Sequence, residues 1–524
     1  MDLNIHPDFP RKKDFRIGIL GAGFIVKECH LPAYRKAGFN PVAIASRNRQ
    51  NAEKAAQCHS VPAVHDSYEQ LLADPSIEVL DIAVPPHLQL GLIKRACERR
   101  TVKGILAQKP LGKNYAEALQ AVHLCEGAGI VLAVNQNMRY DQSVRAAKSL
   151  LNNGTLGDPV LATIDMRGIP HWMPWQAELG WATLRIMSIH HLDCFRYWFG
   201  EPERIFCSVR QDPRTHFPHA DGICSYILEY ASGLRCVAID DTWTGPAREG
   251  CPADLRVQWR IEGTDGLAIG DIGWCREPFT TPSSIRFAHK GDASFHEPRW
   301  TESWFPDAFI GTMAQLLVSL ENSTAPAISG RDNLETMALV EAAYESAKEH
   351  RAISTNEIHS EAAAPVEKPL PAMTPRAHQV LACARTEANN LRHGLIGPEH
   401  MLLGLLILGN SNSAILLQQA GLTLDITRAA VIRLLRNQPP PLPNHPIPLK
   451  QSVNTVLAFA SQEAERLGHA HVGTEHILLG LLLQRGSITT QIFSQFHLYV
   501  DSLLGEIRIR LASVLGFDSE LRMA

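Results

Sequence analysis

The sequence lacks paired cysteines, long apolar runs and an excess of basic charge. Its eleven cysteines form no Cys-x-x-Cys pair, which argues against a disulfide framework and against a thiolate zinc site. The longest apolar patch, Met401 to Leu408, is far too short to cross a bilayer, and no apolar stretch of signal-peptide length stands at the N-terminus. The formal net charge of −4 gives no indication of a nucleic-acid partner or an anionic membrane surface. We therefore expect a cytoplasmic protein with reduced thiols, no metal, no nucleic-acid partner and no membrane association.

At 524 residues the chain is too long for one hydrophobic core, so two to four domains are expected. After a tail over residues 1–14, residues 15–138 alternate apolar runs rich in Val and Ile with helical patterns such as 51–58 and 114–126. The runs predict strands over Arg16–Leu20, Pro41–Ala45, Val79–Val84, Gly104–Ala107 and Ile130–Val134. Parallel strands joined by helices give a doubly wound α/β sheet of the Rossmann type.

The first predicted strand runs into a glycine-rich turn, Gly18-Ile-Leu-Gly-Ala-Gly23, and then into a helix. Gly21 permits the tight turn, Gly23 lets the backbone approach a pyrophosphate closely, and the free N–H groups of the helix attract negative charge. Val26 occupies the place of a third glycine, so helix and strand are expected to lie slightly further apart. The turn predicts a site for a nucleotide diphosphate.

The second predicted strand ends in Ser46-Arg47, at the position where an acidic residue would bind the ribose diol of NAD. A guanidinium pairs with phosphate through two parallel hydrogen bonds, so we favour NADP over NAD as the cofactor. The alternative interpretation of Arg47 is a solvated arginine at the start of a helix.

A lysine follows the fourth predicted strand, in Gln108-Lys-Pro110. The carboxyl end of a parallel strand faces the crevice where ligands bind, and Pro110 fixes the backbone that aims the lysine. Lys109 is therefore the first candidate for a catalytic group, with an ordinary exposed surface lysine as the alternative.

The pattern changes over residues 139–354, where short turns join strand-like segments and indicate an open, mainly antiparallel sheet in an α+β domain. One predicted helix, 181–199, interrupts the strands, and two more, 305–321 and 332–350, close the region. The predicted strands are Val160–Met166, Arg204–Val209, Ile223–Tyr230, Leu234–Asp240, Leu255–Glu262 and Leu267–Asp271.

Several short motifs, in order over about residues 16–354, resemble those of the glucose-fructose oxidoreductase, inositol dehydrogenase and MocA (Gfo/Idh/MocA) family. They are Gly18–Gly23, Val84–His87, Gln108–Pro110, Asn135–Arg139, Leu156–Gly157, Ile189–Asp193, Ile261–Gly266 and the helix from Gly330 to His350. The resemblance implies a two-domain NAD(P)-dependent oxidoreductase that acts on a sugar, a cyclitol or a related polyol. It also implies a homo-oligomer assembled through the open sheet.

Carried over position by position, the resemblance assigns catalysis to Lys109, His190 and Asp193. His190 would take the hydroxyl proton of the substrate, and Lys109 would stabilise the negative charge that develops on its oxygen. Family members carry Asp or Asn where this chain has Ile186, which puts the full acid–base set in question. A histidine packed in the core is the alternative for His190. The expected cofactor contacts are Gly21, Ala22, Gly23, Phe24, Ile25, Ser46, Arg47, Pro85, His87, Gln108, Lys109 and Asn137.

Residues 355–372 contain an alanine run, prolines and charges without periodicity, which predicts a linker. Residues 373–514 then contain an internal repeat, with copies over about 373–437 and 449–514. Its clearest part is Gly-Pro-Glu-His-Met-Leu-Leu-Gly from Gly397, which recurs as Gly-Thr-Glu-His-Ile-Leu-Leu-Gly.

The repeat resembles the N-terminal domain of the Clp family of protein-unfolding ATPases, an all-α module with pseudo-twofold symmetry that contacts other proteins. The Glu-His pairs at Glu399 and Glu475 do not match the spacing of zinc motifs, and we interpret them as helix starts. No phosphate-binding loop of the ATPase type follows, so a protein partner is expected and an ATPase is not.

These observations predict a multidomain NAD(P)-dependent oxidoreductase that carries a C-terminal module for protein interaction. The competing interpretation is an adaptor or sensor linked to protein quality control, which binds a nucleotide but turns over poorly because Ile186 replaces an acidic group. The sequence leaves open the substrate, the choice between NAD and NADP, the partner and the number of subunits.

Overall fold

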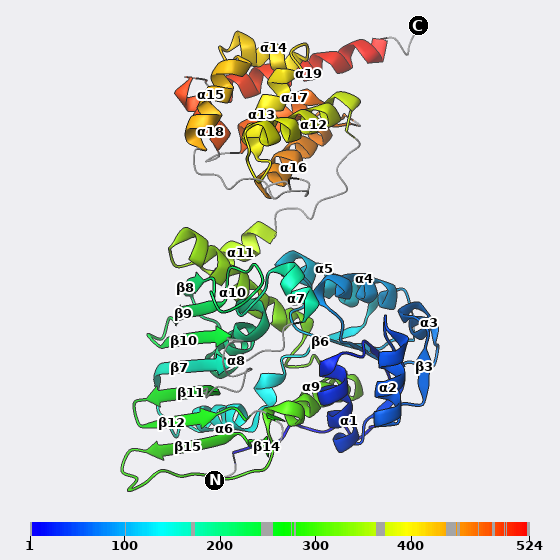
Figure 1. Cartoon of the computed structure of the whole chain (residues 1–524), viewed down its shortest axis with the longest axis vertical. Coiled ribbons are helices and arrows are strands. Elements are labelled where there is room, and N and C mark those ends of the chain that lie inside the picture. Colours follow the sequence, from blue (N-terminus) through cyan, green and yellow to red (C-terminus); the bar gives the residue numbers. More distant parts are fainter. Residues whose placement is uncertain are drawn as a thin grey trace. The chain divides into compact units, whose positions relative to one another are not determined.

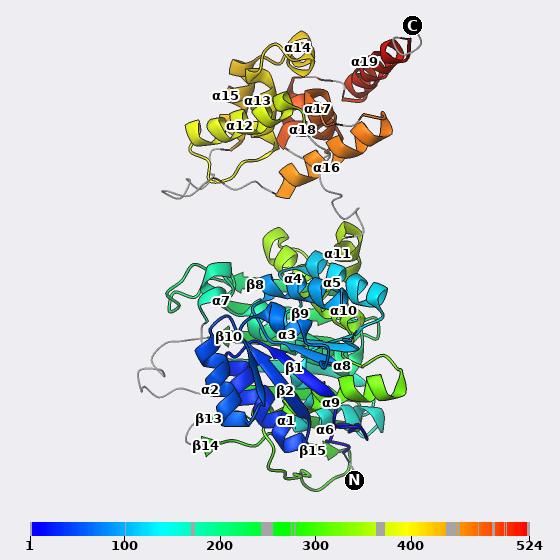
Figure 2. The same ribbon diagram turned by 90° about the vertical axis from the view of Figure 1, so that its right-hand side faces the viewer.

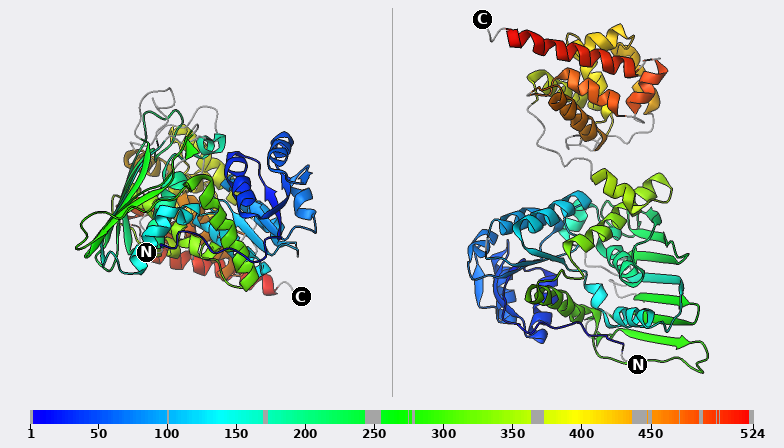
Figure 3. Two further views of the ribbon diagram at one scale, coloured as in Figure 1. Left: turned by 90° about the horizontal axis from the view of Figure 1, so that it is seen from below. Right: turned by 180° about the vertical axis from the view of Figure 1, so that it is seen from behind.

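The chain folds into two compact units, Met1–Ala364 and Pro365–Ala524. A computed structural model describes residues 3–99, 101–168, 173–242, 255–273, 275–276, 279–362, 373–435, 447, 451–469, 471–484, 488–496, 498 and 500–520. In the first unit, helices lie between a parallel sheet and a second, mixed sheet (Figure 1; Figure 3).

The parallel sheet has the strand order β3-β2-β1-β4-β5-β6. Its strands are β1 Arg16–Leu20, β2 Asn40–Ala45, β3 Ala63–His65, β4 Val79–Ile82, β5 Gly104–Ala107 and β6 Val131–Val134. Strands β4 and β5 are buried along their whole length, which is why their residues are apolar apart from Asp81. The buried carboxylate of Asp81 accepts the hydroxyl of Tyr34 at 2.8 Å. The sequence did not predict β3, because it contributes only three half-buried residues.

The helices of this sheet begin at polar capping residues. Asn48, Ser67 and Asn114 each accept a backbone N–H from the first turn of the helix that follows. These caps fix where the chain leaves each strand end and therefore where the strand-end residues lie. The helices are η1 Val26–His30, a π-helix, followed by α1 Leu31–Ala37, α2 Arg49–His59, α3 Tyr68–Ala73, α4 Pro86–Cys97 and α5 Tyr115–Ala128.

The second sheet has the order β15-β12-β11-β7-β10-β9-β8 and is antiparallel except where β10 pairs with β7. Its strands are β7 Pro159–Gly168, β8 Arg204–Arg210, β9 Ile223–Glu229, β10 Arg235–Thr242, β11 Arg256–Gly263, β12 Gly266–Asp271 and β15 Ser284–His289. Alternate residues are buried, so one face packs on the helical layer and the other is open. The expected fold class, a Rossmann domain followed by an α+β domain with a mainly antiparallel sheet, is confirmed.

The helices between the two sheets are η2 Asn137–Tyr140, α6 Gln142–Asn152, α8 Ile189–Phe199, α9 Trp304–Asn322 and α10 Gly330–Glu349. Two sequence predictions differ from the structure here. In place of the single helix predicted over 181–199, the structure has a short π-helix, η3 Leu184–Ser188, that continues into α8. A separate helix, α7 Pro174–Leu179, precedes η3. The predicted linker begins with a helix, α11 Thr355–Ala362, while residues 363–372 lie outside the described part of the chain.

The second unit is all-helical and repeats itself. Helices α12 Pro375–Asn390, α13 Pro398–Ile407, α14 Asn412–Gln419 and α15 Leu424–Leu434 correspond in order to α16 Gln451–Arg466, α17 Thr474–Leu483, α18 Ile488–Gln495 and α19 Val500–Glu520. Figure 2 shows the yellow and the orange half side by side. Gly404 and Gly480 occupy equivalent positions, and a Cβ on them would come within 2.5 Å and 2.2 Å of the carbonyl oxygens of Val380 and Val456. The repeated glycine thus allows each central helix to pack closely on its partner.

Each half also contains a hydrogen-bonded pair of histidines. Nδ1 of His476 accepts the N–H of Gly473 at 2.9 Å, so Nε2 of His476 carries the hydrogen and donates to Nδ1 of His469, also at 2.9 Å. Both rings are therefore neutral, and burial lowers the pKa of His476 to about 4. The first half has the same arrangement in Gly397, His400 and His393.

We expect acid to unfold the second unit. His476 is neutral in the folded unit, so the stability it contributes is present above the unfolded pKa of about 6.5 and is lost as the pH falls through about 4. All nine tryptophans precede residue 305, so tryptophan fluorescence reports on the first unit while far-ultraviolet circular dichroism also records the helices of the second. His476→Gln, which caps without titrating, should move the helix loss to lower pH. Identical acid transitions in both proteins would contradict this account.

Among the described helices, none alone is both long and apolar enough to span a membrane, and only α13 and α14 taken together across a 99° bend reach that length and composition.

Candidate active site

A cavity of about 970 Å³ lies where the carboxyl ends of the parallel strands face the second sheet. One wall consists of the glycine turn and the residues that follow β2, β4 and β5. The opposite wall consists of the ends of strands from the second sheet, helix α7, the π-helix η3 and the start of α9. Open α/β sheets bind their ligands in this crevice.

The glycine turn has the geometry that a pyrophosphate requires. Gly21 has a φ of +119°, and a Cβ on it would lie 2.3 Å from the carbonyl oxygen of Ala83, so only glycine fits. Gly23 lines the cavity, and a Cβ there would meet nothing within 4 Å, so its backbone faces open space. Helical structure begins at Phe24, directly after the turn. The chain therefore fits a dinucleotide at this place.

Ser46 and Arg47 line the same cavity, next to Asn48 and Asn51. The neighbouring Arg49 pairs with Glu53 and Asp66, whereas no carboxylate in the described ranges pairs with Arg47. A cavity-lining guanidinium without a carboxylate partner suits an anionic ligand.

Tyr68 also lines this end of the cavity, at the start of α3. Its hydroxyl contacts the main chain of Arg47, and burial raises its pKa. The sequence did not indicate Tyr68, because nothing in its local pattern shows that α3 returns to the end of β2.

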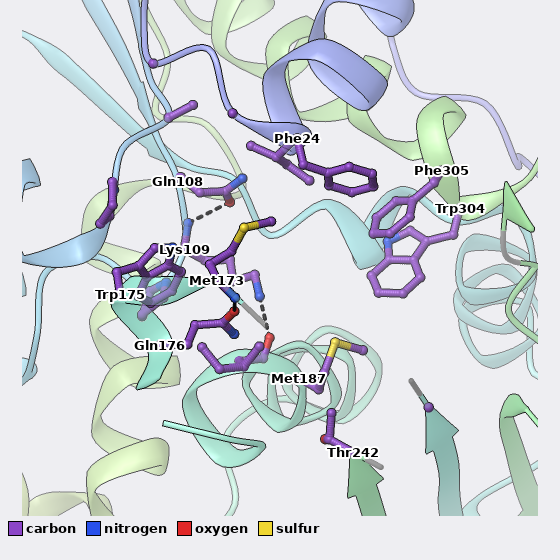
Figure 4. Close-up of a pocket in the computed structure, with 18 of the residues that line it drawn as sticks. Phe24, Gln108, Lys109, Met173, Trp175, Gln176, Met187, Thr242, Trp304 and Phe305 are labelled. Atoms are coloured by element: carbon purple, nitrogen blue, oxygen red, sulfur yellow. Dashed lines mark hydrogen bonds between the residues drawn. The ribbon is translucent and has the colours of Figure 1, made fainter. Parts of the chain in front are cut away.

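Lys109 projects from the end of β5 into the cavity wall (Figure 4). Its backbone N–H donates to the side-chain oxygen of Gln108 at 2.8 Å, which orients the start of the loop. Its Nζ donates to the carbonyl oxygen of Ile186 in η3. Burial lowers the pKa of Lys109 to about 7, and no carboxylate in the described part of the chain pairs with it. The amine is therefore neutral in a large fraction of molecules at neutral pH.

Ile186 supplies a main-chain acceptor at the position where the family resemblance implies Asp or Asn in other members. It belongs to η3, a short π-helix, and such segments occur frequently at functional sites. Its side chain also lines the cavity and is apolar. The lysine is thus held in place without the negative charge that would keep it protonated.

His190 is close to Lys109 but does not line the cavity. Trp304 does line the cavity, and its ring lies 5.4 Å from the ring of His190 in an edge-on arrangement. Nδ1 of His190 is buried, and none of the described residues forms a hydrogen bond with it. Burial, and to a lesser extent the charge of Lys109, lowers the pKa of His190 well below its usual range. The imidazole is therefore neutral and weakly basic.

Asp193 lies away from the cavity, in a buried ion pair with Arg139. Its two carboxylate oxygens accept hydrogen bonds from Arg139 at 2.5 and 2.7 Å, and one also accepts the Thr336 hydroxyl at 2.8 Å. Asp332 contacts the same guanidinium at 2.8 Å. This network joins η2, α8 and α10 and positions the helix that carries His190.

Asp193→Ala should destabilise the first unit by about 3–5 kcal/mol, because it leaves the buried Arg139 without its main partner. Urea unfolding followed by tryptophan fluorescence measures the change. Glu53→Ala, which removes an exposed pair with Arg49, is the control and should cost less than about 1 kcal/mol. Equal, small losses in the two variants would contradict the structural role of Asp193.

Two expected cofactor contacts lie elsewhere. His87 is exposed near the start of α4, and Asn137 is buried and accepts the indole N–H of Trp304 at 2.7 Å. The remaining expected contacts all line the cavity: Gly21, Ala22, Gly23, Phe24, Ile25, Ser46, Arg47, Pro85, Gln108 and Lys109. Sequence reasoning missed Trp304 and Phe305, although two adjacent aromatic residues before an apolar helix were a visible signal.

Comparison with known proteins gives three family matches. Residues 15–136 match the oxidoreductase family with an NAD-binding Rossmann fold, residues 144–269 match the GFO/IDH/MocA C-terminal domain, and residues 372–496 match the Clp repeat N-terminal domain.

Individual relatives agree with the first two matches. D-apiose dehydrogenase of Paraburkholderia graminis is 25% identical over 366 residues, which is 67% of this chain and 92% of that protein. Trans-1,2-dihydrobenzene-1,2-diol dehydrogenase of Mus musculus is 31% identical over 231 residues, 42% of this chain and 66% of that protein.

Among solved structures, an oxidoreductase from Agrobacterium radiobacter in complex with NAD+, L-tartaric acid and magnesium has the same fold. It matches with a TM-score of 0.56 and 20% identity over 66% of this chain and 99% of its own. The resemblance carried by the sequence motifs is thereby confirmed. The chain carries both domains of the Gfo/Idh/MocA oxidoreductase family, followed by a Clp N-terminal repeat domain.

Proposed function

We propose that the protein is an NAD(P)-dependent dehydrogenase or reductase that transfers a hydride between nicotinamide and a carbinol carbon of a sugar, a cyclitol or a related polyol. The observation that carries the proposal is the position of Lys109. Its amine lies in one cavity with the glycine turn and with the wall that the second domain supplies. The named relatives act as dehydrogenases, which supports the same assignment.

In our proposal Lys109 moves the proton. A bound nicotinamide would supply the acceptor for the hydride that leaves the carbinol carbon. The neutral amine of Lys109 takes the hydroxyl proton as the carbon–oxygen double bond forms, and the carbonyl oxygen of Ile186 holds the amine in place. In the reverse direction the protonated amine returns the proton to the alkoxide oxygen.

The geometry favours Lys109 over His190 as the base. The catalytic role that the sequence predicted for His190 stays a prediction. The lowered pKa of His190 and its absence from the lining of the cavity do not support that role. Asp193 acts on this view as a positioning residue, because both of its oxygens are engaged by Arg139.

For the cofactor we propose NADP ahead of NAD, on the basis of Ser46 and Arg47 at the end of β2. Arg47→Ala should weaken NADP binding roughly ten- to a hundredfold, because it removes charge-assisted hydrogen bonds to the 2′-phosphate, and should leave NAD binding nearly unchanged. Fluorescence titration with each cofactor measures this. Arg49→Ala, whose guanidinium already pairs with Glu53 and Asp66, is the matched control. Equal losses for both cofactors would refute the phosphate assignment.

The near-ultraviolet absorbance of nicotinamide tests the proposed function when it is recorded over a panel of sugars and cyclitols beside a cofactor-binding assay. Reduction of the cofactor by any of these alcohols supports the proposal. Tight cofactor binding without turnover in either direction would favour the adaptor or sensor instead. The apolar side chain of Ile186 in place of a carboxylate is the observation that keeps this second candidate open.

We propose further that the Clp-type domain binds a protein partner and that the chain forms a homo-oligomer through the open face of the second sheet. On that face Phe206, Ile227 and Ile239 are about two-fifths exposed on the neighbouring strands β8, β9 and β10. A row of exposed large apolar side chains on a sheet is typical of an interface.

A further inference from the structure

The part of the cavity around the Lys109 amine has mostly apolar walls. Figure 4 shows Lys109 with Met173 and Trp175 on one side of this space, Trp304 and Phe305 on the other, Phe24 above and Met187 below. Trp304 and Phe305 stack with their ring centroids 4.3 Å apart and form one continuous aromatic surface. Met166 and Val257 extend the apolar wall along the second sheet.

Three polar groups of this wall already have hydrogen-bond partners within the protein. The Thr242 hydroxyl lies 2.7 Å from the hydroxyl of Thr183. The side-chain oxygen of Gln176 accepts the backbone N–H of Met173 at 2.6 Å. The indole N–H of Trp304 donates to Asn137. Each of these bonds engages a donor or acceptor that a substrate hydroxyl would otherwise use.

The charged residues at the edge of the wall are paired as well. Arg167 and Arg256 both contact the carboxylate of Asp165, at 2.5 Å each. Asp165 lies on β7, on the face of the sheet opposite the helical layer. Asp271 lines the cavity too, and its carboxylate accepts a hydrogen bond from the side chain of Gln258 at 3.1 Å. Among the described charged residues of this wall, Lys109 is therefore the group that we expect a substrate oxygen to meet.

A polyol hydroxylated on every carbon would place several hydroxyl groups against methionine and aromatic side chains. Each hydroxyl that loses water without gaining a partner weakens binding, whereas an apolar ring gains contact with the same side chains. Aromatic and methionine side chains pack well against flat apolar groups.

We propose that the preferred substrate is a secondary alcohol or vicinal diol on an otherwise apolar ring, not a polyol with a hydroxyl on every ring carbon. This inference rests on the oxidoreductase function proposed above. In the reaction the alcohol loses a hydride from carbon to the nicotinamide and a proton from oxygen to Lys109, and it becomes a ketone. Sugar turnover at lower efficiency is compatible with the same site.

The test compares two compounds with the same six-membered carbon ring, trans-1,2-cyclohexanediol and myo-inositol, as substrates of the full chain with NAD+ and with NADP+. The expected result is a kcat/KM at least about tenfold higher for the cyclohexanediol. If inositol or an aldose is oxidised equally well or better, the substrate inference is overturned and the oxidoreductase function stands. If the cofactor binds but no alcohol is oxidised and no matching ketone is reduced, the oxidoreductase function itself fails.

Two pairs of variants test whether the apolar wall of the cavity causes the preference for an apolar ring. Met187→Gln should lower the ratio of the two kcat/KM values at least about fivefold, because it puts an amide that must lose water beside the ring. Met187→Leu should keep the ratio, since it preserves an apolar surface of similar size. Met173→Gln and Met173→Leu repeat the comparison at a second position of the same wall. An unchanged ratio in both glutamine variants would refute the role of this wall.

Discussion

Lys109→Met is expected to lower kcat/KM for alcohol oxidation by about 10²- to 10⁴-fold while the protein still binds its cofactor. Methionine has a similar length and no titratable group, so it fills the space of the lysine and cannot take a proton. The cavity would keep its glycine turn and Arg47, which lie on other strand ends. Steady-state kinetics and a cofactor titration on the same preparation measure the two effects separately.

Lys113→Met provides the matched control. Lys113 lies on the same loop but is exposed and pairs with Glu117 on the surface, so its loss should leave both kinetics and binding unchanged. If Lys109→Met keeps most of the wild-type kcat/KM, Lys109 is not the proton acceptor. The proton acceptor would then have to be another group, with His190 as the first to examine.

Ile186→Asp should move the pH dependence of alcohol oxidation to higher pH by about 1–3 units. In the wild type, the base form of Lys109 is lost as the pH falls below about 7, because the amine becomes protonated. A carboxylate near Nζ would stabilise the ammonium, raise the pKa of Lys109 and make the base form scarce at neutral pH. Activity at pH 7 should then fall by about tenfold or more, and it should recover in alkaline buffer.

Ile186→Asn separates charge from shape in this experiment. Asparagine has nearly the size of aspartate but no charge, so its pH profile should resemble that of the wild type. If the two variants show the same profile, the pH dependence does not report on the ionisation of Lys109.

The parts of the site that the sequence predicted depend on local structure and on strand order. Gly21 and Gly23 lie in one continuous strand, turn and helix. The positive φ of Gly21 requires glycine, whereas Gly23 faces open space where a ligand can approach. Arg47 and Lys109 each follow a parallel strand, and the carboxyl ends of such strands always meet at one edge of the sheet. The internal repeat likewise predicted two copies of a helical unit, and the structure has four helices in each copy.

The parts that the sequence did not predict depend on packing between distant segments. Nothing near His190 indicates that its ring packs against Trp304 and does not line the cavity. Nothing near Asp193 indicates that Arg139 engages both of its oxygens. The π-helix over Leu184–Ser188 has an apolar spacing that an α-helix could also have. The hydrogen bond between the Ile186 carbonyl and Lys109 could therefore not be predicted from the sequence.

The central claim is that the amine of Lys109 carries the proton in a hydride-transfer reaction. The most direct measurement is the pH dependence of kcat/KM in both directions, between about pH 5.5 and pH 9, with cofactor saturating. We expect a single ionisation near pH 7 to control both directions. The kcat/KM for alcohol oxidation should decrease at pH values below this ionisation, and the kcat/KM for ketone reduction should decrease at pH values above it. A profile that is flat in both directions, or that keeps this ionisation in Lys109→Met, would contradict the account.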